Sequence, residues 1–259
     1  MNRRLLNKYS VSSLLFIAVA AVLIAIALDT AMGEFVTAAF VIAGMVCAMT
    51  GIFILMFSGG EPVDPLLVGL LPAQGCINLC RVASDLGING NAYFLPDRVT
   101  GNTRVMQFNP RSEYTGGTVS AKGSFPETGP EGMVTVPSCD PLIQVLRRRN
   151  TLSIPNNEQK LMQLLEEVTG EIFEFSPRVS VRLAGSRVTI TFHKYRFIEG
   201  CRTIARESKN CCLRNPCPAS SLCGALITEA TDKVVLLEQC SVSSSNQDVI
   251  IIFSVLSSS

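Results

Sequence analysis

Two long stretches near the start of the chain contain no charged residue. Residues 11–28 and 35–57 are almost entirely apolar, and only the six residues 29–34 separate them. At a rise of about 1.5 Å per residue, each stretch is long enough as a helix to cross the hydrocarbon core of a bilayer. Six residues cannot cross back through lipid, where backbone polar groups must be satisfied within each helix. The pattern predicts a transmembrane helical hairpin over residues 1–57, with spans at about 11–28 and 35–57.

The positive residues around the hairpin predict its orientation. Arg3, Arg4 and Lys8 precede the first span, whereas the loop 29–34 carries two acids and no base. Basic residues favour the cytoplasmic side, so we expect a multi-pass protein of the cell membrane with both termini cytoplasmic. An alternative interpretation of residues 1–30 is a cleaved signal peptide. The immediate second span and the absence of a small-x-small cleavage site favour the hairpin.

The rest of the chain alternates between helical and strand patterns. Residues 58–65 are turn formers and predict a linker, and residues 66–259 predict a cytoplasmic domain. Apolar positions recur at helical spacing over 66–86, interrupted near Pro72, whereas 179–183 and 188–192 alternate as a hairpin. Further helices are predicted at 140–149, 156–169, 197–208 and 219–231, and further strands at 92–95, 104–108, 133–136, 233–242 and 249–255. Helices and antiparallel hairpins in mixed order indicate an α+β domain.

Charge excludes some partners for this domain. The chain has 22 Lys+Arg and 21 Asp+Glu, and removing the three bases and two acids of residues 1–57 leaves 19 of each. Such neutrality argues against a nucleic-acid binder. One local patch is basic, and it contains the candidate contacts Arg202, Arg206, Lys209 and Arg214. We expect the bilayer as partner, with anionic headgroups or another membrane protein beside it, although a solvated helix face is the simpler interpretation of the patch.

Nine of the ten cysteines lie outside the predicted spans, and five of these cluster between residues 201 and 223. The five are Cys201, Cys211, Cys212, Cys217 and Cys223. Thiolates bind zinc or iron–sulfur clusters when four of them converge at about 2.3 Å from the metal. No two cysteines have the C-x-x-C spacing that usually marks such sites. We therefore predict no cofactor, and keep zinc or an iron–sulfur cluster on these five residues as the alternative.

Three other interpretations of the cysteines remain open. In a reducing compartment they would be small buried hydrophobic residues, and Cys76 and Cys80, one helical turn apart, fit that use. If the domain faced outward, several disulfides would be expected and one thiol would be left unpaired. A redox switch between Cys211 or Cys212 and Cys217 is the third.

Catalytic residues are not evident in the sequence. His193 is the only histidine, so a Ser-His-Asp or Cys-His system would have to use it. The strand alternation places it opposite Val188, Ile190 and Phe192, on the exposed face, which predicts a solvated surface histidine. There is no phosphate-binding glycine motif.

The chain resembles a family of uncharacterised archaeal membrane proteins of the methanogen type. The resemblance lies in Tyr93-Phe94-Leu95-Pro96, in Val134-Thr135-Val136-Pro137 before Pro141 and Leu142, and in the segment from Cys217-Pro218 to Gly224 that leads to Ala230, Thr231, Lys233 and Val234. That pattern usually carries Cys-Pro-x-Cys, whereas five residues separate Cys217 from Cys223 here. The resemblance implies a two-helix membrane hairpin and a cytoplasmic α+β domain, and no activity.

These observations predict a membrane-anchored cytoplasmic domain used for interaction or sensing. The hairpin and the absence of a recognisable catalytic set carry this hypothesis. The alternative function is a membrane-tethered metal or iron–sulfur protein that uses the 201–223 cysteines.

Overall fold

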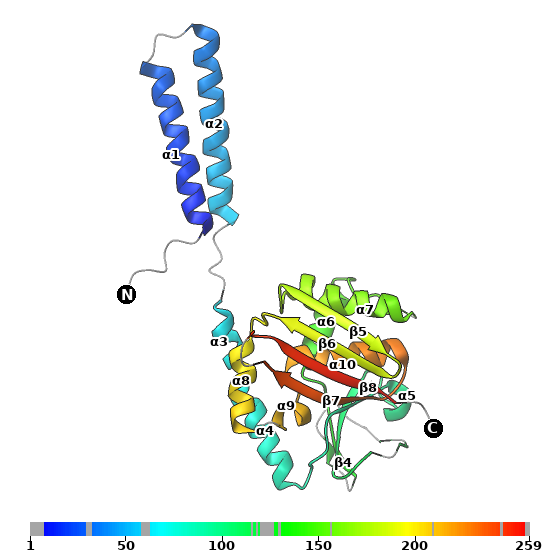
Figure 1. The fold of residues 1–259 in the computed structure, drawn as a ribbon. Helices are drawn as coiled ribbons and strands as arrows, with labels where there is room; N and C mark the ends of the chain where they lie inside the picture. Colours follow the sequence, from blue (N-terminus) through cyan, green and yellow to red (C-terminus); the bar gives the residue numbers. More distant parts are fainter. Residues whose placement is uncertain are drawn as a thin grey trace. The chain divides into compact units, whose positions relative to one another are not determined.

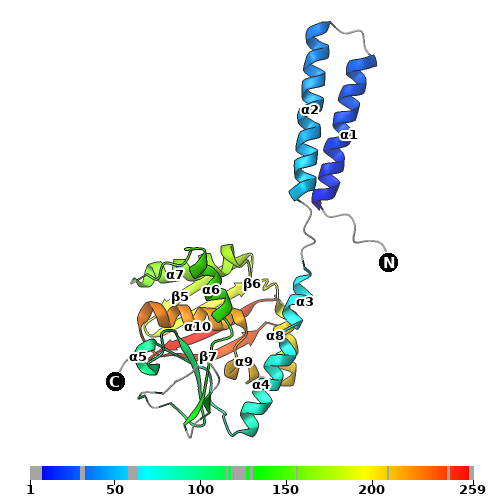
Figure 2. The same cartoon turned by 180° about the vertical axis from the view of Figure 1, so that it is seen from behind.

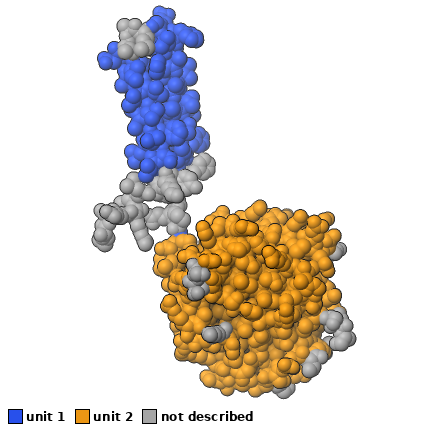
Figure 3. Space-filling model, in the orientation of Figure 1, with its two compact units in different colours: residues 1–63 blue, residues 64–259 orange. Residues whose placement is uncertain are grey.

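The computed structural model of the chain divides into two compact units, residues 1–63 and 64–259 (Figure 3). It describes residues 8–29, 33–57, 63–114, 116–117, 119, 127–128, 131–155, 157–208, 210–243 and 246–256. Each unit is described by itself below. Most of the predicted linker lies outside the described residues. Its end belongs to the second unit: the Asp64 carboxylate accepts a hydrogen bond from the Leu66 N–H and caps a helix that starts at Pro65.

The first unit is a pair of helices, α1 (Lys8–Asp29) and α2 (Glu34–Phe57), joined by a short connection (Figure 1). Small residues seven positions apart line their contact: Ser13, Ala20 and Ala27 on α1, and Gly44 and Gly51 on α2. The Ser13 hydroxyl donates to the Gly51 carbonyl across the pair at 2.7 Å. Small residues at this spacing let two helices approach closely.

Three helical stretches of the described chain are long and apolar enough to cross a membrane by composition: Val11–Asp29, Glu34–Met56 and Pro65–Asp85. The third belongs to the second unit and consists of two helices, α3 (Pro65–Leu70) and α4 (Ala73–Asp85), separated at Pro72 as predicted. One face of α4 packs on α8 (Ile198–Glu207) and α9 (Cys211–Arg214). Arg81, on α4, pairs with Glu207 of α8.

The second unit is built on one eight-stranded sheet in which every neighbouring pair is antiparallel. Its order is β3-β4-β2-β1-β7-β8-β6-β5. The strands are β1 (Tyr93–Leu95), β2 (Met106–Pro110), β3 (Glu127–Thr128), β4 (Gly132–Thr135), β5 (Arg178–Ala184), β6 (Arg187–His193), β7 (Val235–Val242) and β8 (Val249–Val255). With the helices, this sheet confirms the predicted α+β class.

Three helices cover one face of the sheet: α6 (Asp140–Arg148), α7 (Glu158–Glu166) and α10 (Pro218–Thr231) (Figure 2). Every residue of α10 from Ala219 to Thr228 is buried, and all of them are small, apolar or hydroxyl-bearing side chains without charge. The Phe94 ring of β1 lies against Gly224, where a Cβ atom would overlap the ring. The main core therefore lies between α10 and the centre of the sheet.

A smaller core lies between α4, α8 and α9, and cysteine dominates it. Its members are Ala73, Cys76, Ile77, Cys80, Ile204, Cys211 and Cys212, with Cys240 of β7 packed against them. Beside it, α3 and α8 touch backbone to backbone at Gly69 and Gly200, because a Cβ atom on Gly200 would overlap the Gly69 carbonyl. Glycine at both positions is what permits this contact.

The structure differs from the predicted elements mainly at short segments. The helix expected from Asn156 is capped by Asn157, whose side chain accepts from the Gln159 N–H, and it continues as a π-helical turn, η1 (Glu167–Ile172). Two four-residue helices, α5 (Asp97–Thr100) and α9, were not expected, because they are shorter than any apolar period. The two-residue strand β3 lies between β2 and β4, where no element is predicted from the sequence.

Filling the glycine contact of the helical pair should separate α1 from α2. A Cβ atom at Gly51 would lie 2.9 Å from Ile17 Cγ1 and 3.2 Å from the Ser13 carbonyl oxygen. We expect Gly51→Leu to open the hairpin and slow its migration on SDS gels. Ala43→Leu adds the same kind of side chain at an exposed position of α2 and should leave migration unchanged. Identical migration of the two variants would contradict the assigned contact.

Candidate functional site

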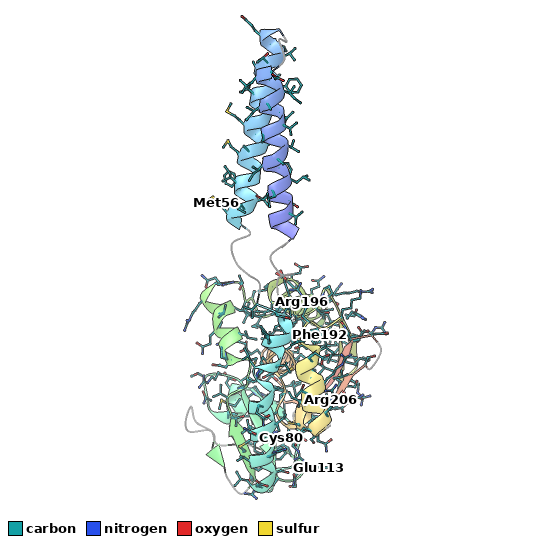
Figure 4. All side chains as sticks on the ribbon, turned by 90° about the vertical axis from the view of Figure 1, so that its left-hand side faces the viewer. Met56, Cys80, Glu113, Phe192, Arg196 and Arg206 are labelled. Carbon is teal, nitrogen blue, oxygen red and sulfur yellow. The ribbon has the colours of Figure 1, made fainter. Side chains whose placement is uncertain are left out.

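Six cysteines of the second unit lie close enough together, in three pairs, to influence one another's ionisation. Cys201 of α8 contacts Cys217, Cys211 of α9 contacts Cys80 of α4, and Cys212 contacts Cys240 of β7. Residues from helices and a strand far apart in the sequence supply each pair. Figure 4 labels Cys80 on α4, which lies beside α8. The cysteine cluster of the sequence is therefore distributed over several pairs.

Cys217 has the most polar surroundings of these thiols. It is the N-cap residue of α10, so its side chain lies where the first backbone N–H groups of the helix have no intrahelical partner. Its sulfur is 3.4 Å from the Ser220 hydroxyl, and the backbone N–H groups of Ala219 and Ser220 lie near it in the first turn of the helix. The thiol of Cys201 and the phenol of Tyr195 lie beside it and line the same cavity. Polar groups therefore approach this sulfur from more than one element.

These polar neighbours lower the pKa of Cys217 to about 6, the adjacent Cys201 thiol contributing most and burial opposing it. The pKa of Cys201 is raised well above its usual value by the adjacent Cys217 sulfur and by burial. In this pair the thiolate belongs to Cys217, since only its sulfur also faces a helix N-terminus and the Ser220 hydroxyl. Burial raises the pKa of Cys211, and the neighbouring Cys240 thiol together with burial raises that of Cys212.

The Cys217 side chain borders an apolar cavity of about 230 Å³. Residues from α3, α4, α6, α8 and α10 and from the segment before α8 form its walls: Val68, Gly69, Pro72, Cys76, Leu142, Phe175, Tyr195, Phe197, Gly200, Cys201, Ile204, Cys217, Pro218 and Ala219. Apart from the Tyr195 hydroxyl and the thiols, the side chains of this lining are hydrocarbon. A cavity with such walls suits a small apolar molecule and brings it beside a thiolate.

A larger and more polar cavity, of about 500 Å³, lies at the other end of α10. Arg104 and Arg147 border it, but each already forms an ion pair, with Asp140 at 3.3 Å and with Glu229 at 2.7 Å. Acids and bases are mixed around this cavity, so it lacks the excess positive charge that an anion site needs. The apolar cavity is therefore the better candidate for a ligand.

The structure brings only some of the predicted metal ligands together. Cys201, Cys212 and Cys217 lie within electrostatic reach of one another, whereas Cys211 is paired with Cys80, and Cys223 lies further along α10, near Cys139. Within the described residues, no group of three or more cysteine, histidine or acidic side chains is arranged to hold a metal ion. Zinc or iron–sulfur binding by these five cysteines stays an untested alternative.

The predicted basic patch is only partly a surface feature. Arg206 is exposed on α8 (Figure 4), and Arg202 forms an ion pair with Glu199 at 2.6 Å. The Arg214 guanidinium turns toward α4 and donates to the Ser84 hydroxyl at 3.2 Å. Lys209 lies outside the described residues. Contact with anionic headgroups stays a prediction, and Arg206 is the described residue best placed for it.

His193 lies on the exposed side of β6, as predicted, but it has partners that the sequence did not indicate. Its Nδ1 is 3.2 Å from Asp248 Oδ2, and its Nε2 is 3.3 Å from the Ser180 hydroxyl. This is the order of a Ser-His-Asp system. Ser180, however, lies within the continuous register of β5 with β6, not on the sharp turn that supplies an oxyanion donor beside a nucleophile. Asp248 also accepts from the Lys194 N–H, so the chain of contacts fastens the end of β6 to the β7–β8 connection.

Comparison with known proteins identifies no relative: no family model matches the chain, and neither the curated proteins nor the solved structures contain a match. The resemblance to archaeal membrane proteins therefore stays a prediction. The function has to be argued from the cavity and the thiols.

The sequence does carry a signal for Cys217 that a search for C-x-x-C does not find. Cys217, Pro218, Ala219 and Ser220 form a C-x-x-S motif at the start of a helix, with proline in its first turn. A hydroxyl three residues after an N-cap cysteine reaches the sulfur just as a second cysteine does. The long-range partners Cys201 and Tyr195 leave no such local signal.

The donors around Cys217 predict an unusual pH dependence of its reactivity. Alkylation proceeds through the thiolate, so the rate at Cys217 should rise with pH to half of its maximum near pH 6, as its lowered pKa requires. Cys201→Ala removes one donor and should move this midpoint to higher pH. Cys240→Ser changes another thiol pair and should leave the midpoint in place.

Iodoacetamide labelling of the full chain, followed by mass spectrometry of the peptide that contains Cys217, measures these rates. A midpoint of about 8.5, the ordinary thiol value, would contradict the assigned thiolate.

Proposed function

We propose that the chain is an integral membrane protein whose α1–α2 hairpin holds a sensing domain at the cytoplasmic surface. The uncharged lengths of α1 and α2 support two spans, as do their large apolar side chains that no protein covers, such as Leu28 at 81% exposure and Phe35 at 88%. The stretch Pro65–Asp85 is the less suitable third candidate. Its second helix uses one face in a protein core and carries Arg81 and Asp85.

The orientation rests on Arg3, Arg4 and Lys8 before the apolar span Val11–Asp29, opposite a connecting loop without a base. We expect a green fluorescent protein fused after Ser259 to fluoresce, and alkaline phosphatase fused there to be inactive. Alkaline phosphatase inserted between α1 and α2 should be active and serves as the control. An active phosphatase at the C-terminus would contradict the proposal and place the soluble unit on the oxidising side.

The sensing role rests on one observation, the apolar cavity of about 230 Å³ between α3, α4, α8 and α10. The helix α6 also borders this space through Leu142, so a molecule that fills it would contact five helices and stabilise their arrangement. One of these helices, α3, begins only eight residues after the end of α2. We propose that a small apolar ligand occupies the cavity and that the domain responds by fixing α3 against α8.

Filling the cavity with protein should abolish ligand binding. A ligand at ten times its Kd stabilises the folded state by about 1.4 kcal/mol, so indole should raise the Tm of the wild-type chain in detergent. Leu142→Trp places a ring in the cavity and should abolish this rise. Val145→Trp introduces the same ring on the same helix, α6, at an exposed position outside the cavity, and should keep the rise.

Val68→Phe fills the cavity from α3 instead and provides a second variant should Leu142→Trp fail to fold. An unchanged wild-type Tm in indole, or an equal rise in both cavity-filling variants, would overturn ligand binding at this site.

A further inference from the structure

One of the three thiol pairs borders the apolar cavity, whereas the other two do not. Cys201 and Cys217 both line the apolar cavity, whereas the contacts of Cys211 and Cys212 lie outside its walls. Cys217 is also only partly buried, while Cys211 and Cys212 are buried. A small molecule in the cavity therefore reaches the Cys201–Cys217 pair and not the others.

We propose that Cys217 is an oxidation site for an organic hydroperoxide bound in the cavity, and that Cys201 is the thiol that closes the resulting disulfide. This inference rests on the proposed function only in that both use the same cavity. Cys217 supplies the nucleophile, and Cys201 lines the same cavity close enough to interact with it electrostatically. The geometry thus holds an attacking and a resolving sulfur side by side, with the substrate space open to the first.

The protonation of the pair suits this division of roles. The pKa of Cys217, lowered to about 6, makes its sulfur a thiolate at neutral pH, whereas Cys201 keeps its proton. Cys76 lines the same cavity, but burial raises its pKa to about 11, so it is a protonated bystander. Thiolates, and not thiols, attack peroxides, and a thiol with a pKa near the ambient pH combines abundance with nucleophilicity.

The reaction balances in two steps. In the first, the Cys217 thiolate attacks the terminal oxygen of the hydroperoxide. The S–O bond forms, the O–O bond breaks, and the alkoxide takes a proton from water and leaves as an alcohol. In the second, the Cys201 sulfur attacks the sulfenic acid on Cys217. The S–S bond forms, the S–O bond breaks, and the hydroxide leaves as water with the Cys201 proton. The two sulfurs lose two electrons and the peroxide gains them.

The cavity walls favour an organic hydroperoxide over hydrogen peroxide. Val68, Leu142, Phe175 and Phe197 present hydrocarbon to the space beside the sulfur. An apolar tail gains free energy by leaving water for such walls, while hydrogen peroxide gains none. The Tyr195 hydroxyl and the Ser220 hydroxyl lie at the sulfur, where the peroxide oxygens arrive.

The full chain in detergent, reduced and freed of reductant, tests the proposal with cumene hydroperoxide. After quenching with N-ethylmaleimide, peptide mass spectrometry should find a disulfide between Cys201 and Cys217, with Cys80, Cys211, Cys212 and Cys240 alkylated. Cys201→Ser keeps a hydroxyl donor and should accumulate a Cys217 sulfenic acid that dimedone traps. Cys217→Ser should give neither product. Cys201→Ala also removes the resolving thiol and serves as a second variant of this kind.

At equal concentrations, cumene hydroperoxide should react at least about tenfold faster than hydrogen peroxide, since a tenfold ratio needs only about 1.4 kcal/mol of apolar binding.

The site would be overturned if Cys217 were still alkylated by N-ethylmaleimide after the peroxide treatment, or if it formed a disulfide with a cysteine other than Cys201. Equal rates with the two peroxides would overturn the assignment of an organic substrate. The indole measurement is independent of these results. A disulfide without indole binding would overturn the proposed ligand alone, and indole binding without oxidation would overturn the thiol site alone.

Discussion

The burial of α10 against the centre of the sheet is the constraint on which the second unit depends. The two halves of the sheet meet where β1 pairs with β7, and Phe94 of β1 lies at this seam. Its ring fits against Gly224 and makes an edge contact with Phe253 of β8, with ring centroids 6.3 Å apart. One aromatic side chain thereby joins both halves of the sheet to the central helix. Because α10 is fixed along its length, its first turn is fixed too, and Cys217 is held in place by a rigid element.

Local patterns predicted the elements well and their long-range pairing poorly. The alternation of Val188, Ile190 and Phe192 predicted a strand of the hairpin, and the run from Val249 to Val255 coincides with β8. The pairing of β1 with β7 joins residues more than a hundred positions apart, and no local period encodes it. The same limit applies to the thiols. Closeness in sequence suggested Cys211 or Cys212 as the partner of Cys217, but the fold of α8 brings Cys201 there instead.

The cysteines divide by environment. Cys139 and Cys223 are fully buried in the main core, where burial raises the pKa of both, that of Cys139 to about 12, so they act as small hydrophobic residues. The smaller core uses thiols as packing material in the same way, although its pairs are also in contact. Only Cys217 combines partial exposure, a helix N-terminus and several donors. The sulfur content of the chain is therefore mostly structural, and one residue differs from the rest through its position.

The contact between Gly69 and Gly200 gives the thiol pair a mechanical connection to the chain before it. Two helices that touch through their backbones have no side chain between them to yield, so they move together. Gly69 lies on α3, the first helix after the linker, and Gly200 immediately precedes Cys201 in the sequence. A displacement of α3 would consequently act on α8 one residue before Cys201, which lines the cavity together with Cys217. The wall that carries this pair of thiols is therefore tied to the position of α3.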